Sequence, residues 1–139
     1  YGQSAAALAA AGAERHVADV CPGFPDRIEL TDAAPGATLL LLNFVHQPAA
    51  NPYRASHAIY VREGAERAYE AVGEIPPALA IRPLSLRGFD RGDRLVAAEL
   101  AEGEAQPAAI GRLLAGPRVA YPHAHYARFG CYAARIERA

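Results

Sequence analysis

Two histidines near the C-terminal end of the chain, His123 and His125, carry the clearest potential for chemistry. They lie two residues apart, so on a β-strand both imidazoles point to the same face, about 7 Å apart by the rise of a strand. Cys131 follows them, after a Phe-Gly pair that is typical of a turn. Two imidazoles and a thiol can bind a metal ion, transfer protons or line a polar pocket, and the spacing leaves these choices open.

A metal site would need at least one more ligand, because two histidines alone bind zinc or iron weakly. The side chains that could supply it from another strand are His46, His57, Asp26 and Asp90. The alternative is that the two histidines are ordinary sheet residues, exposed in part or hydrogen-bonded, that bind no ligand.

His57 begins a predicted strand, directly after a loop that contains Tyr53, and His46 ends the strand before that loop. If these strands pair, both imidazoles lie at one end of a sheet, where loops build pockets. A histidine in that place suits general acid–base chemistry on a small anionic or carbonyl-bearing compound. A histidine that only binds backbone carbonyls is the alternative.

Four residues are candidates for binding a ligand. Arg87 can bind a carboxylate or phosphate through two parallel hydrogen bonds, although an ion pair with Asp90 at a hairpin is the simpler explanation for an arginine at this position. Tyr53 or Tyr126 can donate a hydrogen bond to a developing oxyanion. Cys131 can act as a nucleophile only if it is partly exposed and has a base nearby, and a buried cysteine on a strand is the commoner case.

The composition excludes several classes of function. The 139-residue chain has a net charge of −1 and no basic stripe, which argues against nucleic-acid binding. All 14 basic residues are arginine, so Schiff-base chemistry on a lysine is impossible. The chain has no apolar run of membrane-spanning length, no recognisable signal peptide and only two cysteines. We therefore expect a cytoplasmic protein without a membrane partner.

The hydrophobic pattern predicts the elements that must position these side chains. Strands are expected at residues 15–20, 27–30, 37–46, 57–62, 81–89, 95–100, 118–126 and 131–138. Helices are expected at residues 3–13, 64–72 and 106–115. Because most connections are short, the strands should pair antiparallel.

The expected fold class is α+β. We expect a twisted antiparallel sheet of five or six of these strands, which can curl toward a barrel, with two or three short helices at one side or end. The length predicts one domain over residues 1–139, with residues 1–14 as a peripheral helix.

Three segments of the chain have a distinctive pattern. They are Leu-Leu-Leu-Leu-Asn-Phe-Val-His at residues 39–46, Ser-His-Ala-Ile-Tyr-Val-Arg at residues 56–62, and Tyr-Pro-His-Ala-His-Tyr-Ala at residues 121–127, which Phe-Gly-Cys-Tyr follows at residues 129–132. Together, and in this order, they resemble a bacterial family catalogued only as domain of unknown function 1203. The likeness covers most of the chain after about residue 15.

The resemblance implies no activity, since none is established for that family. It does imply a set of polar positions that match the family's pattern, namely His57, Arg62, Arg87, Asp90, His123, His125 and Cys131. One position departs from the pattern: where the family commonly has Gly-Tyr-Pro-Cys-Arg, this chain has Gly-Phe-Pro-Asp-Arg at residues 23–27. Asp26 therefore stands in place of a thiol, and no role of that thiol carries over.

The first hypothesis is a small domain with a polar pocket that binds a small anionic or carbonyl-bearing molecule and can transform it by histidine-mediated proton transfer. Its catalytic candidates are His57, His123 and His125, and its binding candidates are Tyr53, Arg87, Tyr126 and Cys131. This hypothesis requires no cofactor. It leaves open whether the chain is an enzyme.

Two alternatives belong to other classes. One is a non-catalytic small-molecule-binding or dimeric assembly module, in which the Leu-rich strand and the Ala-rich N-terminal segment form a homodimer. The other is a metal site on His123 and His125 that binds zinc or iron. The metal site predicts stoichiometric bound metal and a melting temperature that a chelator lowers.

Overall fold

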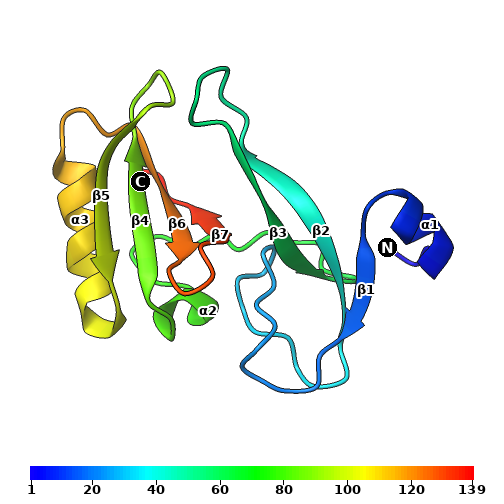
Figure 1. Ribbon diagram of the computed structural model, residues 1–139. Coiled ribbons are helices and arrows are strands. Elements are labelled where there is room, and N and C mark those ends of the chain that lie inside the picture. Colours follow the sequence, from blue (N-terminus) through cyan, green and yellow to red (C-terminus); the bar gives the residue numbers. More distant parts are fainter.

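The computed structural model describes residues 1–139, and its strands form two antiparallel sheets (Figure 1). The first sheet has the order β1-β2-β3, made of β1 (Glu14–Val17), β2 (Thr38–Gln47) and β3 (Ala55–Arg62). The second has the order β5-β4-β6-β7, made of β4 (Leu84–Phe89), β5 (Leu95–Ala101), β6 (Tyr121–Tyr126) and β7 (Tyr132–Arg135). The helices are α1 (Ala5–Ala10), α2 (Pro77–Ala80) and α3 (Gln106–Ala115), with a short 3₁₀ turn, η1 (Gly103–Ala105), before α3.

The predicted α+β class and antiparallel pairing are confirmed. The strands, however, number seven and form two separate sheets, where the sequence predicted one sheet of five or six strands. The reason lies in residues 63–83, which contain no strand and carry the chain from one sheet to the other. Each sheet is therefore built from one continuous half of the chain.

Two predicted elements are wrong. Residues 64–72 form an irregular segment rather than a helix, because Gly64 has a positive φ of 91° and the backbone N–H of Tyr69 donates a hydrogen bond to the carbonyl of Ile28. Residues 27–30 form a tight turn rather than a strand. This turn forms around the fully buried carboxylate of Asp26, which accepts hydrogen bonds from the backbone N–H groups of Glu29 and Arg62.

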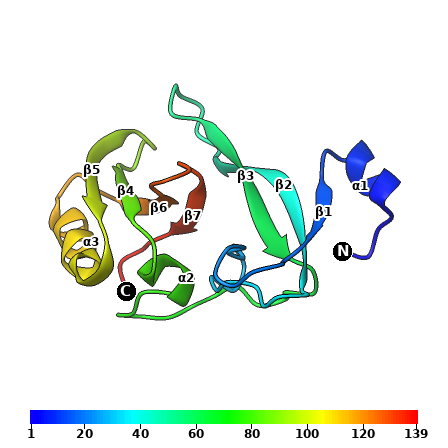
Figure 2. The same ribbon diagram turned by 60° about the horizontal axis from the view of Figure 1, so that its bottom comes forward.

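The main hydrophobic core lies between α3 and one face of the second sheet. It includes Leu84 and Leu86 of β4, Ala124 and Tyr126 of β6, and Ala109 and Leu113 of α3. The residues between these strand positions point to the opposite face, because side chains alternate along a strand. They are Ser85, Arg87, His123 and His125, and their face is turned toward the first sheet (Figures 1 and 2).

Side chains fasten the two sheets to each other at both ends. At one end the Asn51 side-chain amide, in the β2–β3 loop, donates hydrogen bonds to the backbone carbonyls of Gly92 and Asp93 in the β4–β5 loop. At the other, the Arg82 guanidinium forms a bidentate ion pair with Asp32, which is largely buried. These contacts join the two halves of the chain on either side of the space between the sheets.

None of the helices is long and apolar enough to cross a membrane. Both cysteines, Cys21 and Cys131, are free thiols, so the chain has no disulfide.

Candidate functional site

Four of the five histidines of the chain meet in the space between the two sheets. His46 on β2 and His57 on β3 come from the first sheet, and His123 and His125 on β6 come from the second. The ring centre of His46 lies 4.7 Å from that of His57, 5.0 Å from that of His125 and 6.0 Å from that of His123. We call these four residues the histidine cluster.

An irregularity in β2 lies directly beside His46. The register of β2 with β3 shifts between Phe44 and Gln47, which is a β-bulge. As a result two consecutive residues, His46 and Gln47, are both buried between the sheets, where a regular strand would have placed them on opposite faces. Gln47 donates a hydrogen bond to the hydroxyl of Tyr121 on the second sheet.

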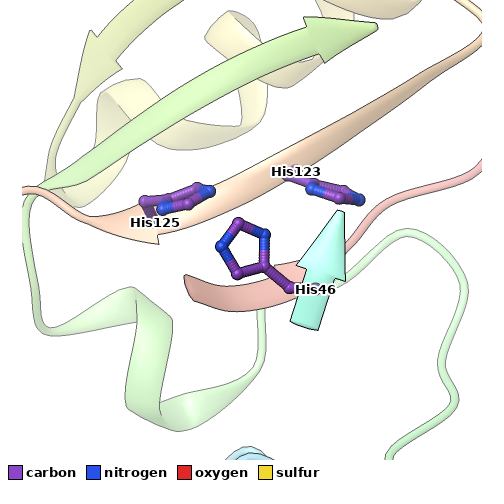
Figure 3. A group of neighbouring side chains, drawn as sticks. All are labelled: His46, His123 and His125. Atoms are coloured by element: carbon purple, nitrogen blue, oxygen red, sulfur yellow. The ribbon is translucent and has the colours of Figure 1, made fainter. Parts of the chain in front are cut away.

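Three members of the cluster bring ring nitrogens close to one another. One ring nitrogen each of His46, His123 and His125 lies within 4.8 Å of the other two, and the three residues are 8%, 2% and 1% exposed. In Figure 3, His123 and His125 project from β6 and the ring of His46 approaches them from β2. Imidazole nitrogens bound to one tetrahedral zinc ion at about 2.0–2.1 Å lie roughly 3.4 Å apart, so the rings would have to move closer together to share an ion.

The hydrogen bonds of the cluster identify which nitrogens are free. Nδ1 of His125 lies 2.9 Å from the carbonyl oxygen of Gly130, which can only accept, so this nitrogen carries the proton and Nε2 keeps its lone pair. Nδ1 of His46 and Nδ1 of His123 are buried and have no hydrogen-bond partner. An unpartnered buried polar atom is costly and calls for a missing water or ion.

His57 contacts His46 within the cluster. Its Nδ1 lies 2.6 Å from Nε2 of His46, and the two ring planes are within 19° of parallel. The ring centres are 4.7 Å apart, and a contact of 2.6 Å between the two nitrogens is possible at this separation only if both nitrogens lie close to the line that joins the centres. The two rings therefore meet edge to edge. When His46 donates this hydrogen bond, its buried and unpartnered Nδ1 is left with a free lone pair.

Burial keeps the three innermost imidazoles neutral. It lowers the pKa of His46 and of His123 to about 4 and that of His125 to about 3. The positive charge of Arg87 lowers the pKa of all three further, and burial followed by the same charge also lowers the pKa of His57. Neutral imidazole is the form that binds metal ions.

Aromatic rings line the cluster. The ring of Tyr132 on β7 is parallel to that of His46, with ring centres 4.9 Å apart, and lies edge-on to that of His123, with ring centres 5.2 Å apart. Phe89 lies 5.0 Å from His123 on its other side. These rings pack against the imidazoles and hold them in position. Neither of them had a signal in the sequence, because an aromatic residue on a strand is most often a core residue.

Arg87 reaches the same face as the histidines but makes no ion pair. It lies directly opposite His123 in the β4–β6 register, and its only hydrogen bond joins Nε to the Ser85 hydroxyl at 3.2 Å. The predicted ion pair with Asp90 is wrong, because the Asp90 carboxylate instead accepts hydrogen bonds from the backbone N–H groups of Gly92 and Arg94 in the hairpin turn.

The other predicted binding residues lie outside the cluster. Tyr53 sits in the β2–β3 loop, where its ring faces the guanidinium of Arg94 at 5.5 Å. Tyr126 points to the opposite face of β6 from the histidines, into the core and beside the guanidinium of Arg27. The thiol of Cys131 accepts a hydrogen bond from the same guanidinium at 3.1 Å. The structure therefore gathers His57, His123, His125 and Arg87 and leaves these three apart.

The comparisons with known proteins agree with the resemblance noted in the sequence. The model of a family described as "Protein of unknown function (DUF1203)" matches residues 23–138, a segment that contains the whole histidine cluster. No curated protein and no solved structure gives a significant match.

Proposed function

The chain belongs to the DUF1203 family of proteins of unknown function, and we propose that its histidine cluster is a metal centre in which His46, His123 and His125 bind one divalent transition-metal ion. The observation that carries this proposal is the convergence of three buried ring nitrogens from two sheets within 4.8 Å. The unpartnered Nδ1 atoms of His46 and His123 support it, since an ion would satisfy both.

The donor set indicates the kind of ion. Three neutral imidazoles, without a thiolate or carboxylate, suit Zn²⁺, Fe²⁺, Ni²⁺ or Cu²⁺ rather than Mg²⁺ or Ca²⁺, which prefer oxygen ligands. Three protein ligands also leave at least one coordination position for water or substrate, as in catalytic rather than structural zinc sites. An ion held in this way would polarise what binds there.

The surrounding hydrogen bonds match those of established metal centres. In such centres each histidine ligand commonly donates its second N–H to a carbonyl, carboxylate or water, which fixes its orientation and tautomer. Here His125 donates to the Gly130 carbonyl and His46 can donate to His57. In this proposal His57 is a positioning residue that holds the ring of His46.

The metal-free alternative, in which histidines transfer protons directly, is less well supported. A general base works best with a pKa near the pH at which the enzyme operates. Burial lowers the pKa of His123 to about 4 and of His125 to about 3, so these side chains are weak bases at neutral pH. The same burial suits them as metal ligands.

The test is the metal content of the purified chain after incubation with Zn²⁺ or Fe²⁺ and gel filtration, measured by mass spectrometry. We expect about one ion per chain in the wild type. His46→Gln, His123→Gln and His125→Gln should each lose most of it. His16→Gln is the matched control, because His16 is the fifth histidine, on β1, and bonds only to Glu14.

Circular dichroism would establish that each variant is folded. Metal content that is absent from the folded wild type, or equal in the wild type and all cluster variants, would refute the metal centre. Loss in the three cluster variants alone would support it.

A further inference from the structure

Arg87 and Ser85 extend the face of the sheet that carries the cluster. In the β4–β6 register Arg87 lies opposite His123 and Ser85 lies opposite His125. Paired residues of an antiparallel ladder share one face, so the guanidinium and the hydroxyl lie beside the two imidazoles. The charge of Arg87 acts on all four histidines of the cluster, which fits this position.

The guanidinium of Arg87 has free donors. Its Nε bonds to the Ser85 hydroxyl, while its two terminal NH₂ groups have no hydrogen-bond partner and no carboxylate within ion-pair distance. Two other half-buried arginines differ in this respect. Arg82 is paired bidentately with Asp32, and Arg27 donates to two carbonyls and a thiol. A half-buried guanidinium with unused donors is unusual for a purely structural residue.

The charge of the occupied centre would be unbalanced. Three neutral imidazoles around a divalent ion leave both positive charges uncompensated, and Arg87 adds a third on the same face. Arg135 also acts on His123 as a positive charge, and its guanidinium lies over the Tyr121 ring. The one carboxylate acting on His123 is that of Asp93, which already accepts a hydrogen bond from the Tyr121 hydroxyl.

From this geometry we infer that the centre binds a small oxyanion, with one oxygen on the metal ion and another accepting hydrogen bonds from the terminal NH₂ groups of Arg87. This inference rests on the proposed metal centre. The two terminal NH₂ groups of Arg87 can both donate to the second oxygen of a carboxylate or to a further oxygen of a phosphate, and the hydrogen bond from Nε to Ser85 holds the guanidinium in place. The substrate class of the centre is therefore an organic acid or a phosphate ester that presents such a group.

The experiment uses the full chain loaded with Co²⁺, whose visible absorption spectrum changes when its ligands change. The Co²⁺-loaded wild type is titrated in parallel with acetate and with inorganic phosphate. The same titrations are made with Arg87→Gln, with Arg87→Lys and with the control Arg118→Gln, in which an exposed arginine without a hydrogen-bond partner loses its charge.

We expect a saturable spectral change in the wild type and in Arg118→Gln. Loss of the charged hydrogen bonds should weaken the anion's affinity about 10- to 100-fold in Arg87→Gln, with the Co²⁺ content unchanged. Arg87→Lys should restore part of it, since the charge returns without the fork. Tighter binding of acetate would indicate a carboxylate substrate, and tighter binding of phosphate would indicate a phosphate ester.

Two outcomes would overturn the inference, and they can be told apart. A chain that holds Co²⁺ but shows no spectral change with either anion, or the same affinity in Arg87→Gln as in the wild type, refutes the oxyanion site and leaves the metal centre standing. A folded chain that holds no Co²⁺ refutes both.

Discussion

The imidazoles of His46, His123 and His125 are buried in their neutral form, and this has a consequence for stability. Their pKa values in the folded chain, about 4, 4 and 3, are well below the ordinary value of 6.5 that applies once the chain unfolds. Between these values the unfolded chain binds more protons than the folded one. Stability therefore falls as the pH falls through this range and is insensitive to these groups above it.

We predict that the free energy of unfolding of the metal-free protein is nearly constant from pH 8 to about pH 6.5 and then declines steeply toward pH 4. Urea denaturation at a series of pH values measures it. In the double variant His123→Asn/His125→Asn the decline should be much shallower, because two of the three buried titrating groups are gone. An equally steep decline in that variant would assign the pH dependence to other groups.

Single residues of the site could be predicted from the sequence only where their spacing has a structural meaning. The separation of His123 and His125 by two residues correctly placed both on one face of a strand. His46 was one of four possible further ligands, and nothing in the sequence favoured it over Asp26 or Asp90. Both carboxylates instead accept backbone hydrogen bonds in turns, a local role that the sequence cannot distinguish from metal binding.

At the level of the elements, the spacing of residues along β2 places His46 on the face of the cluster, because His46 follows Phe44 by two residues and Phe44 shares its face with His57. Phe44 pairs with His57 and Gln47 pairs with Ala55, so β2 has one more residue than β3 in this interval. Deletion of Val45 would restore a regular ladder. His46 would then lie opposite Ser56 and point away from the face that His57 shares with Phe44.

We predict that the Val45 deletion abolishes metal binding while the sheet still forms, whereas Val45→Ala retains it. The side chain of Val45 is 40% exposed, so its truncation alone should have little effect. Metal content and circular dichroism of both variants provide the measurement. Retention of a full equivalent of metal by the deletion variant would contradict the role of His46 as a ligand.

The predicted elements were most accurate where the hydrophobic pattern agreed with proline and glycine residues that begin or end an element. The helix at residues 106–115 was predicted with the bounds of α3, because Pro107 suits its first turn and Gly116-Pro117 ends it. The strand at residues 37–46 differs from β2 by one residue at each end. The bulge itself was invisible, since the sequence there contains no glycine or proline to indicate it.

On the scale of the whole molecule, the division into two sheets could not be read from the sequence. Hydrophobic alternation identifies strands but not their partners, and the segment at residues 64–72 has a composition compatible with a helix. Its actual course, with the backbone of Tyr69 bonded to Ile28, depends on contacts between distant parts of the chain. The site lies between the sheets and so depends on the part of the fold that was hardest to predict.

Because each sheet comes from one continuous half of the chain, the protein can be regarded as two complementary fragments joined by an exposed tether. A break between Val72 and Gly73 would fall in that tether, where Val72 is 81% exposed. One fragment would carry His46 and His57 and the other His123 and His125. Neither fragment alone would hold all three proposed ligands.

Fragments 1–72 and 73–139, produced together, should therefore associate more tightly with Zn²⁺ than with a chelator, by an amount set by the affinity for the ion. The measurement is gel filtration of the fragment pair with Zn²⁺ and with a chelator. A pair that carries His46→Gln should associate equally under the two conditions. Association that is indifferent to the ion would mean that it does not bridge the halves. If the difference is found, the same two fragments would serve as a metal-responsive molecular switch that assembles more tightly where the ion is supplied.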